Sequence, residues 1–165
     1  MASRRDGAGN DYYLLFNKAG AILKGFDHES VMSPYAFDPP QTWPGILEQV
    51  PAVFASFLAE PAFALEAATF CIWRTYSDEK WQVGDIQFPA GADPDGSAYL
   101  LALLDGNPQN YCEWATENFE TEVDLKAVEH IFAHRPLTVQ IVHSLNADLD
   151  LNDLMGDLKE IGYPI

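Results

Sequence analysis

YYLLFNKAGAILKGF, residues 12–26, holds two apolar runs separated by the short segment Asn17-Lys18-Ala19-Gly20. Apolar runs of this length on either side of a glycine-containing turn are typical of a β-hairpin. Gly20 can adopt the positive φ angle that such a turn needs. The stretch therefore predicts two antiparallel strands at the start of a sheet.

A second hairpin is predicted further along the chain, with arms at 69–74 and 80–88. Trp73, Trp81 and Val83 give both arms the bulky side chains that strands favour. Residues 1–10, which precede the first hairpin, are rich in glycine and charge and predict a flexible lead-in. A long polar segment with several prolines, 27–44, follows the first hairpin and predicts a loop.

From residue 95 onward the pattern becomes helical. Asn107 and Asp124 are predicted helix N-caps, and Gly162 is predicted to close the last helix. The predicted helix after Asn107 carries an apolar stripe of Tyr111, Trp114, Ala115 and Phe119. The helix capped by Asp124 is predicted to turn Leu125, Val128, Ile131 and Phe132 inward, and a short helix after Pro136 is predicted to bear Leu137, Ile141, Val142 and Leu145. Strands followed by helices indicate the α+β class. We therefore expect a single α+β domain over 11–165, with an antiparallel sheet from two N-terminal hairpins and a helical C-terminal half.

The chain is strongly acidic. Its 25 Asp and Glu residues against nine Lys and Arg give a net charge of −16. Phosphate binding depends on Lys and Arg side chains, so nucleic acid is not expected as a partner. An anionic membrane surface is disfavoured for the same reason. A basic protein would be attracted, and this is the partner that the charge favours. The alternative is that the charge serves solubility alone.

The cysteine content indicates a reducing compartment. Cys71 and Cys112 do not form a Cys-X-X-Cys pair, and no disulfide is expected. The N-terminal residues contain no apolar segment of the kind found in a signal peptide. No apolar stretch reaches the 18 residues that suggest a membrane span. We therefore expect a cytoplasmic protein.

Candidate binding residues lie in the loop after the first hairpin. Asp27, His28 and Glu29 are consecutive, and Tyr35 follows in the same loop. Such groups can act in acid–base chemistry or bind a ligand, or they can instead anchor the loop. Trp43 lies further along the loop and is a candidate exposed anchor for a partner. The alternative for Trp43 is a ring folded back over the sheet.

Two patterns resemble metal sites but depart from them. His130 and His134 have the spacing of zinc-binding histidines, yet Ile131 follows His130 where those enzymes carry glutamate. A histidine near a helix C-terminus is also favoured by the helix dipole alone. The run from Asp148 begins like a calcium loop, but Asp153 and Lys159 occupy the positions of the required glycine and glutamate. We therefore expect no metal, no cofactor and no catalytic set.

Five short segments carry a resemblance to a known family. They are Gly25–Ser30, Met32–Tyr35, Trp43–Gly45, Thr69–Arg74 and Leu104–Pro108. Through them nearly the whole chain resembles an uncharacterised family of small acidic bacterial proteins. The resemblance implies no catalytic or binding residues. More loosely, a compact acidic α+β domain resembles the immunity proteins of bacterial toxin systems.

Three hypotheses for the function follow. The first is a cytoplasmic protein-binding domain, in one form an immunity protein that neutralises a basic toxin, with Tyr35 and Trp43 as contact residues. The second is a small-molecule enzyme or ligand-binding protein with its site in the Asp27–Tyr35 loop, which would need His28 near a second acid inside a pocket. The third is a structural or regulatory domain. The sequence leaves the partner and the oligomeric state open.

Overall fold

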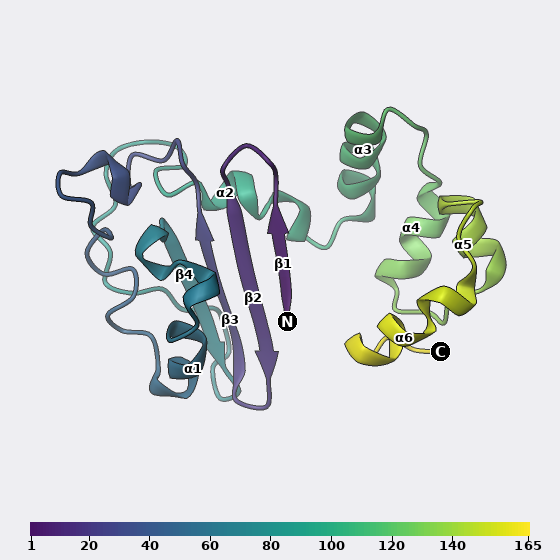
Figure 1. Ribbon diagram of the computed structural model, residues 1–165, viewed down its shortest axis with the longest axis horizontal. Helices are drawn as coiled ribbons and strands as arrows, with labels where there is room; N and C mark the ends of the chain where they lie inside the picture. Colours follow the sequence, from purple (N-terminus) through teal and green to yellow (C-terminus); the bar gives the residue numbers. More distant parts are fainter. The chain divides into compact units, whose positions relative to one another are not determined.

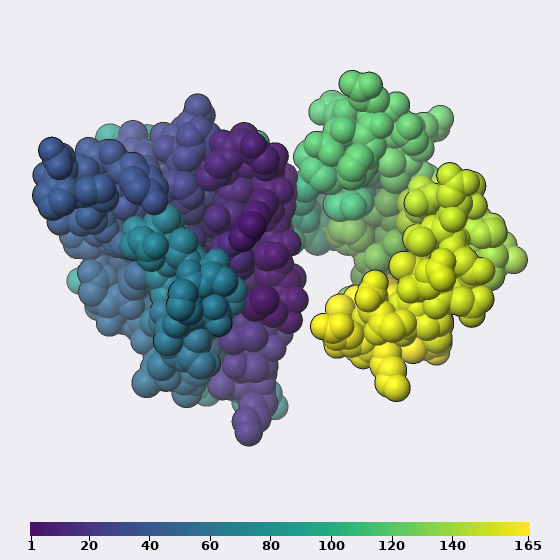
Figure 2. All heavy atoms as spheres, viewed as in Figure 1, coloured from purple at the N-terminus to yellow at the C-terminus, as the bar shows by residue number.

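The computed structural model describes residues 1–165 and confirms the α+β class (Figure 1). An antiparallel sheet occupies the N-terminal part, and the C-terminal half is helical. The chain folds as two compact units, Met1–Ala102 and Leu103–Ile165, where the sequence predicted one domain over 11–165. In Figure 2 the first unit runs from purple to teal and the second from green to yellow. We call them the sheet unit and the helical unit.

Four strands form the sheet in the order β1-β2-β3-β4, with every neighbouring pair antiparallel. Their bounds are β1 Ala2–Arg5, β2 Asp11–Asn17, β3 Gly20–Phe26 and β4 Phe70–Thr75. The predicted first hairpin is the pair β2–β3, in which Asn17 lies opposite Gly20. Gly20 has the expected positive φ, +142°, and a Cβ there would lie 2.1 Å from the carbonyl oxygen of Arg74. This position therefore requires glycine.

Strand β1 corrects the prediction of a flexible lead-in over 1–10. Ala2–Arg5 pairs with the segment from Leu14 back to Asp11. The turn between the two strands is closed by Asp6, whose carboxylate accepts hydrogen bonds from Ala8 N, Asn10 N and Asn10 Nδ2. The strand lies at the edge of the sheet and is mostly exposed, so it lacks the apolar alternation that reveals a buried strand.

The second predicted hairpin is only half formed. Its first arm is β4, but the return arm pairs with β4 at one isolated bridge, between Trp73 and Gln82. Trp81 and Val83 are both exposed, so burial does not hold this arm against the sheet. After Gln82 the chain instead packs closely against the loop that contains Gly45. A Cβ on Gly84 would lie 1.8 Å from the carbonyl oxygen of Gly45.

Different segments cover the two faces of the sheet. The connection between β3 and β4 covers one face with short helical turns, among them α1, Ala55–Leu58 (Figure 1). Its buried side chains and those of the sheet form the main core, which comprises Tyr13, Ile22, Met32, Ile46, Phe54, Phe57, Phe63, Ala68, Cys71 and Trp73. Helix α2, Ser97–Leu100, contributes Leu100 to a smaller core on the other face, with Tyr12, Leu23 and Phe70.

The helical unit contains four helices. They are α3 Pro108–Phe119, α4 Leu125–Phe132, α5 Val139–Leu145 and α6 Leu151–Ile161. The predicted caps are confirmed: Asn107 and Asp124 accept from backbone N–H groups of α3 and α4, and Gly162 ends α6 in the left-handed conformation. None of the helices is long and apolar enough to cross a membrane.

Few side chains of the helical unit are buried. Those that are buried number six, namely Cys112, Ala115, Ala127, Val128, Val142 and Leu158. Two of the six are alanines, which shield little apolar surface. A unit of about 60 residues already buries a smaller fraction of its surface than a larger domain does. The helical unit therefore leaves much of its apolar surface in contact with solvent.

Candidate functional site

The loop after β3 is fastened to the chain just before α2. Asp27 N donates to Thr69 Oγ1 at 3.1 Å, and Thr69 Oγ1 donates to the carbonyl oxygen of Asp95 at 2.7 Å. Ser30 Oγ donates to the carbonyl oxygen of Pro94 at 2.7 Å and accepts from Met32 N. These bonds use the polar groups of the loop to hold two backbone segments together. They favour the anchoring interpretation of this loop.

The side chains of Asp27, His28 and Glu29 have separate surroundings. Asp27 Oδ1 accepts from Glu29 N at 2.9 Å. Asn10 Oδ1 lies 2.8 Å from His28 Nδ1 and also accepts from His28 N. Because the Asn10 amide nitrogen donates to Asp6, its oxygen is the atom left to accept from His28 Nδ1.

The remaining ring nitrogen of His28 has a weak partner. His28 Nε2 lies 3.9 Å from Glu29 Oε1, and the two side chains are 43% and 84% exposed. An ion pair this exposed contributes little. The imidazole is therefore oriented by structural hydrogen bonds at a solvent-exposed position.

Tyr35 and Trp43, the two predicted contact residues, differ in exposure. Tyr35 is exposed, and its ring meets the ring of Phe26 edge-on at 5.8 Å. Trp43 is half-buried and packs against the main core, while its Nε1 donates to the carbonyl oxygen of Gln87 at 3.2 Å. The structure therefore gives Trp43 the folded-back position and leaves Tyr35 as the exposed aromatic ring of the pair.

His130 and His134 make local contacts at the end of α4. His130 Nε2 lies 2.8 Å from the carbonyl oxygen of Pro136. His134 has a positive φ of 51°, and its ring stacks on Tyr163 with the centroids 5.5 Å apart. The structure contains no group of three or more His, Cys, Asp or Glu side chains that could hold a metal ion. Each of the two rings therefore has a local partner near the end of α4.

Lys24 is a buried lysine that no sequence pattern revealed. Lys24 has no solvent-exposed surface, and its Nζ lies 3.3 Å from Asp11 Oδ1 and 5.6 Å from the Tyr13 ring centroid. Burial lowers the pKa of Lys24, and the charge of Asp11 opposes that shift. Cys71 lies opposite Lys24 on β4, and burial raises the pKa of its thiol to about 12. The ammonium and the thiol are closed off from any ligand, so we assign both a structural role.

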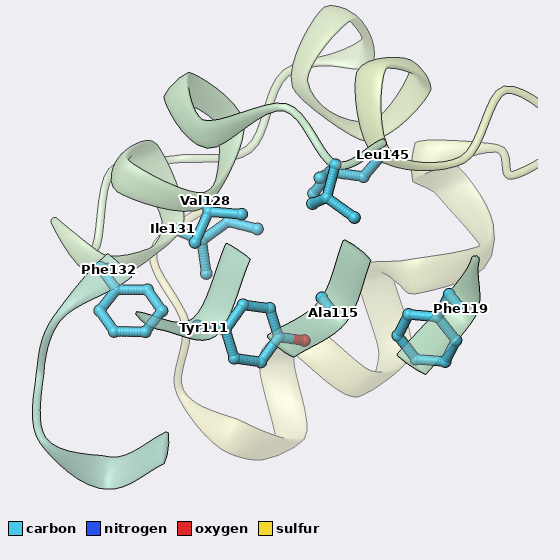
Figure 3. Close-up of a pocket in the computed structure, with 8 residues that line it drawn as sticks. Tyr111, Ala115, Phe119, Val128, Ile131, Phe132 and Leu145 are labelled. Carbon is cyan, nitrogen blue, oxygen red and sulfur yellow. The ribbon is translucent and has the colours of Figure 1, made fainter. Parts of the chain in front are cut away.

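The helical unit contains an apolar groove, shown in Figure 3, which we call the helical groove. Its volume is about 390 Å³. Helix α3 provides one wall, α4 a second, and Leu145 of α5 closes the third side (Figure 3). The lining residues are Tyr111, Ala115, Phe119, Val123, Val128, Ile131, Phe132 and Leu145. Apart from the hydroxyl group of Tyr111, the lining side chains are entirely apolar.

Large apolar side chains of the helical groove are open to solvent. Phe119 is 61% exposed, Leu145 41% and Phe132 37%, while Ala115 and Val128 are buried. The sequence predicts that Phe132 faces inward, and its exposure corrects that prediction, whereas Phe119 and Leu145 are predicted only as members of apolar helix stripes. Large contiguous patches of exposed apolar surface mark interaction sites on folded proteins. The helical groove is therefore the candidate functional site.

Acidic side chains lie beside the helical groove along the chain. Glu120 follows Phe119, and Glu122 and Asp124 flank Val123; all three are exposed. We call these three residues the acidic rim. The helical unit as a whole carries 12 acidic side chains against three Lys and Arg, a net charge of −9. An apolar groove in this setting matches a ligand that is itself apolar and positively charged.

Comparison with known proteins yields no match to a family model, a curated protein or a solved structure. The resemblance to a family of small acidic bacterial proteins, drawn from the sequence, therefore stays a prediction.

Proposed function

We propose that this chain is an acidic, cytoplasmic protein-binding domain that takes up part of a basic protein in the helical groove. The observation that carries the proposal is the exposure of Phe119, Phe132 and Leu145 around one apolar hollow. Water contact with these side chains is unfavourable by roughly 25 cal/mol for each Å² of apolar surface. A partner that covers them removes this cost.

The charge of the chain supports a basic partner. A net charge of −16 raises the rate of encounter with a positively charged protein and repels acidic proteins. An immunity protein that masks a basic toxin is one form of this function. The cytoplasmic setting is supported by Cys71 and Cys112, which are both free thiols.

The alternative function is that of a small-molecule enzyme or ligand-binding protein with its site in the Asp27–Tyr35 loop. The hydrogen bonds of Asp27, His28 and Ser30 go to the backbone and to Asn10 and so support an anchoring role. The helical groove, by contrast, contains apolar surface that the helices of its own unit leave exposed. For this reason we place the binding function in the helical unit.

Capture of partners from a bacterial lysate tests the proposal, with the full chain immobilised at low and at moderate salt. Three proteins are compared: the wild type, the groove variant Phe119→Ser/Leu145→Ser, and the control variant Val139→Ser/Ile161→Ser. The control also removes two exposed apolar side chains from the helical unit, but neither lines the groove. Circular dichroism of all three checks that the helices are retained.

We expect a basic protein to bind the wild type and the control stoichiometrically, and the groove variant to lose it. Binding should weaken as salt rises, because steering by charge is screened. Recovery of no stoichiometric basic partner at low salt would contradict the proposal. Equal recovery on the groove variant would place the binding surface elsewhere.

A further inference from the structure

The wall that α3 gives to the helical groove has a regular repeat. Tyr111, Ala115 and Phe119 lie four residues apart, so they stack along one face of the helix. Eight residues of α-helix rise about 12 Å, which is a little over two turns. The groove therefore has the length of two turns of a second helix laid alongside α3.

The profile of the groove also suits a helix. Ala115 is buried between the two aromatic rings of Tyr111 and Phe119, so the middle of the wall is low and its ends are high. Val128 on α4 forms buried floor opposite (Figure 3). A Leu or Phe side chain from a docked helix can enter over Ala115 while Phe119 and Tyr111 flank it. Repeating apolar anchors at i, i+3 or i+4, and i+7 are how helices fill grooves of this kind.

Charge decides between a foreign helix and a second copy of this chain. A second copy brings another net charge of −16 to a surface that is already acidic, so self-association is opposed. The acidic rim instead attracts Lys and Arg side chains beside the apolar anchors. These side chains can also lay their aliphatic stems on the apolar wall while keeping their charges in water.

We infer that the helical groove recognises a basic amphipathic α-helix of the partner. Its apolar face enters between α3, α4 and α5, and its Lys and Arg residues lie toward the acidic rim. This inference rests on the proposed function and specifies the part of the partner that is bound.

Peptide selection tests the inference with the full chain. The probe is a library of amphipathic peptides of about five helical turns, roughly 18 residues. Four anchor positions at i, i+3, i+4 and i+7 vary over Leu, Ile, Phe, Met and Trp, and the other face carries Lys and Arg. A second library has the same composition in scrambled order, so its net charge is identical but its apolar face is lost. Enriched peptides are measured by fluorescence anisotropy.

The groove variants then show whether the selected peptides occupy the helical groove. Phe119→Ser/Leu145→Ser should weaken binding about tenfold or more, since both side chains would be anchor contacts. Val139→Ser/Ile161→Ser should leave it unchanged, because neither residue lines the groove. Both pairs are exposed, so neither change is expected to unfold the unit.

A second pair of variants isolates the acidic rim. Glu120→Gln/Glu122→Gln removes two charges that are next to the groove residues Phe119 and Val123 along the chain, and Glu113→Gln/Glu117→Gln removes two from α3. Glu113 and Glu117 are each two residues from Ala115, which places them on the opposite side of the helix. At physiological salt the screening length is about 8 Å, shorter than the width of a helix. We therefore expect the rim variant to weaken binding and reduce its salt dependence more than the control does.

Each outcome bears on the inference. Enrichment of peptides from the periodic library alone supports the inference when binding is also weakened in both the Phe119→Ser/Leu145→Ser variant and the Glu120→Gln/Glu122→Gln variant. Equal enrichment from the scrambled library, no enrichment from either, or unchanged binding by the Phe119→Ser/Leu145→Ser variant overturns it. So does concentration-dependent dimerisation that the same variant abolishes, because the occupant would then be a second copy. If the groove variant loses a basic lysate protein but no peptide is enriched from the periodic library, then the inference of a bound helix is wrong and the proposed function stands. If the periodic library enriches but no basic protein is captured, the proposed function fails.

Discussion

Burying the Lys24 ammonium in the sheet costs free energy, and its partner Asp11 offsets only part of that cost. The ammonium is fully shielded from solvent, and Asp11 is the carboxylate within reach, at 3.3 Å. The Asp11 side chain itself keeps 23% of its surface exposed, so water still hydrates it. Removing charges from water costs several kcal/mol for each ion even in real proteins. The two members of the pair should therefore respond differently to substitution.

Asp11→Asn should destabilise the protein by about 2–3 kcal/mol, because it leaves the buried Lys24 ammonium without its counter-charge. Lys24→Met should change the free energy of unfolding by less than about 1 kcal/mol, since it removes the buried charge and keeps the volume. Urea unfolding of both variants at pH 7 measures the difference. Equal losses in the two variants would show that the pair is a net source of stability.

The residue scale is where the sequence was least informative. Lys24 is the single charged residue of β3, and a lysine in a strand is usually exposed. Only the register that sets Lys24 beside Asp11 and Cys71 shows that it is buried. In the same way, the sequence named His28 and Trp43 as candidates, but their roles depend on Asn10 and Gln87, which lie far from them along the chain. Long-range partners of this kind leave no local pattern.

At the scale of elements, the ends of the helices follow from capping residues. The Asp124 carboxylate accepts from Lys126 N at the start of α4, and Asp150 does the same for Asn152 N at the start of α6. Each of these bonds satisfies one of the N–H groups that a helix start leaves without an intrahelical partner. Helix α4 also forms one wall of the helical groove, so its cap bears on the candidate site.

Asp124→Ala should reduce the free energy of unfolding of the helical unit by about 1 kcal/mol, since it removes the N-cap of α4. The matched control is Asp148→Ala, which removes the same charge from the same unit but lies ahead of the cap of α6. Thermal melts followed by circular dichroism compare the two. A loss no larger than that of the control would mean that the cap contributes little.

Capping patterns locate an element but do not say which of its faces is covered. The sequence predicted α3 and α4 with their caps, yet it also predicted that Phe132 faces inward. A periodic apolar stripe looks the same whether another part of the chain covers it or solvent does. Strand β1 was not predicted for the opposite reason, because an exposed edge strand with two arginines has no apolar stripe. The helical groove is therefore visible only once the helices are packed.

At the scale of the whole molecule, burial is distributed unevenly. The main core in the sheet unit includes Phe54, Phe57, Phe63 and Trp73, whereas the six buried residues of the helical unit include none of the large aromatic ones. Segments with few buried apolar contacts open more readily. The two units should therefore differ in local stability.

Hydrogen exchange should show this difference directly. We expect the backbone amides of β2, β3 and β4 to exchange most slowly, and those of α3, α4, α5 and α6 to exchange faster, because fewer buried side chains hold the helices. Mass spectrometry of peptides from the exchanged protein measures both units in one experiment, with the strands as the internal reference. Equal protection in strands and helices would contradict the uneven distribution of stability.

Net charge makes a prediction about salt. At pH 7 the net charge of −16 repels itself, and this repulsion works against the compact state. Added salt screens charges that are separated by more than about 10 Å at 0.1 M. The melting temperature should therefore rise between low salt and about 0.1 M sodium chloride. A melting temperature that ignores salt would mean that the acidic groups are well dispersed, and the charge would then lose its weight as support for a basic partner.

Acid should remove stability through a small number of carboxylates. Burial raises the pKa of Asp6, but the N–H donors of Ala8 and Asn10 outweigh it and lower the pKa below its usual value of 3.8. An unfolded chain then binds a proton at Asp6 more readily than the folded one, so stability rises with pH through this range. The contribution of Asp6 is complete above about pH 5 and is lost as pH falls through its folded-state pKa, below about 4. Asp6→Asn should therefore destabilise the protein at pH 7 and by a smaller amount at pH 3, whereas Asp148→Asn should match the wild type at pH 7. Urea melts at the two pH values measure this, and a deficit of Asp6→Asn that is as large at pH 3 as at pH 7 would show that the β1–β2 turn does not depend on the charge of Asp6.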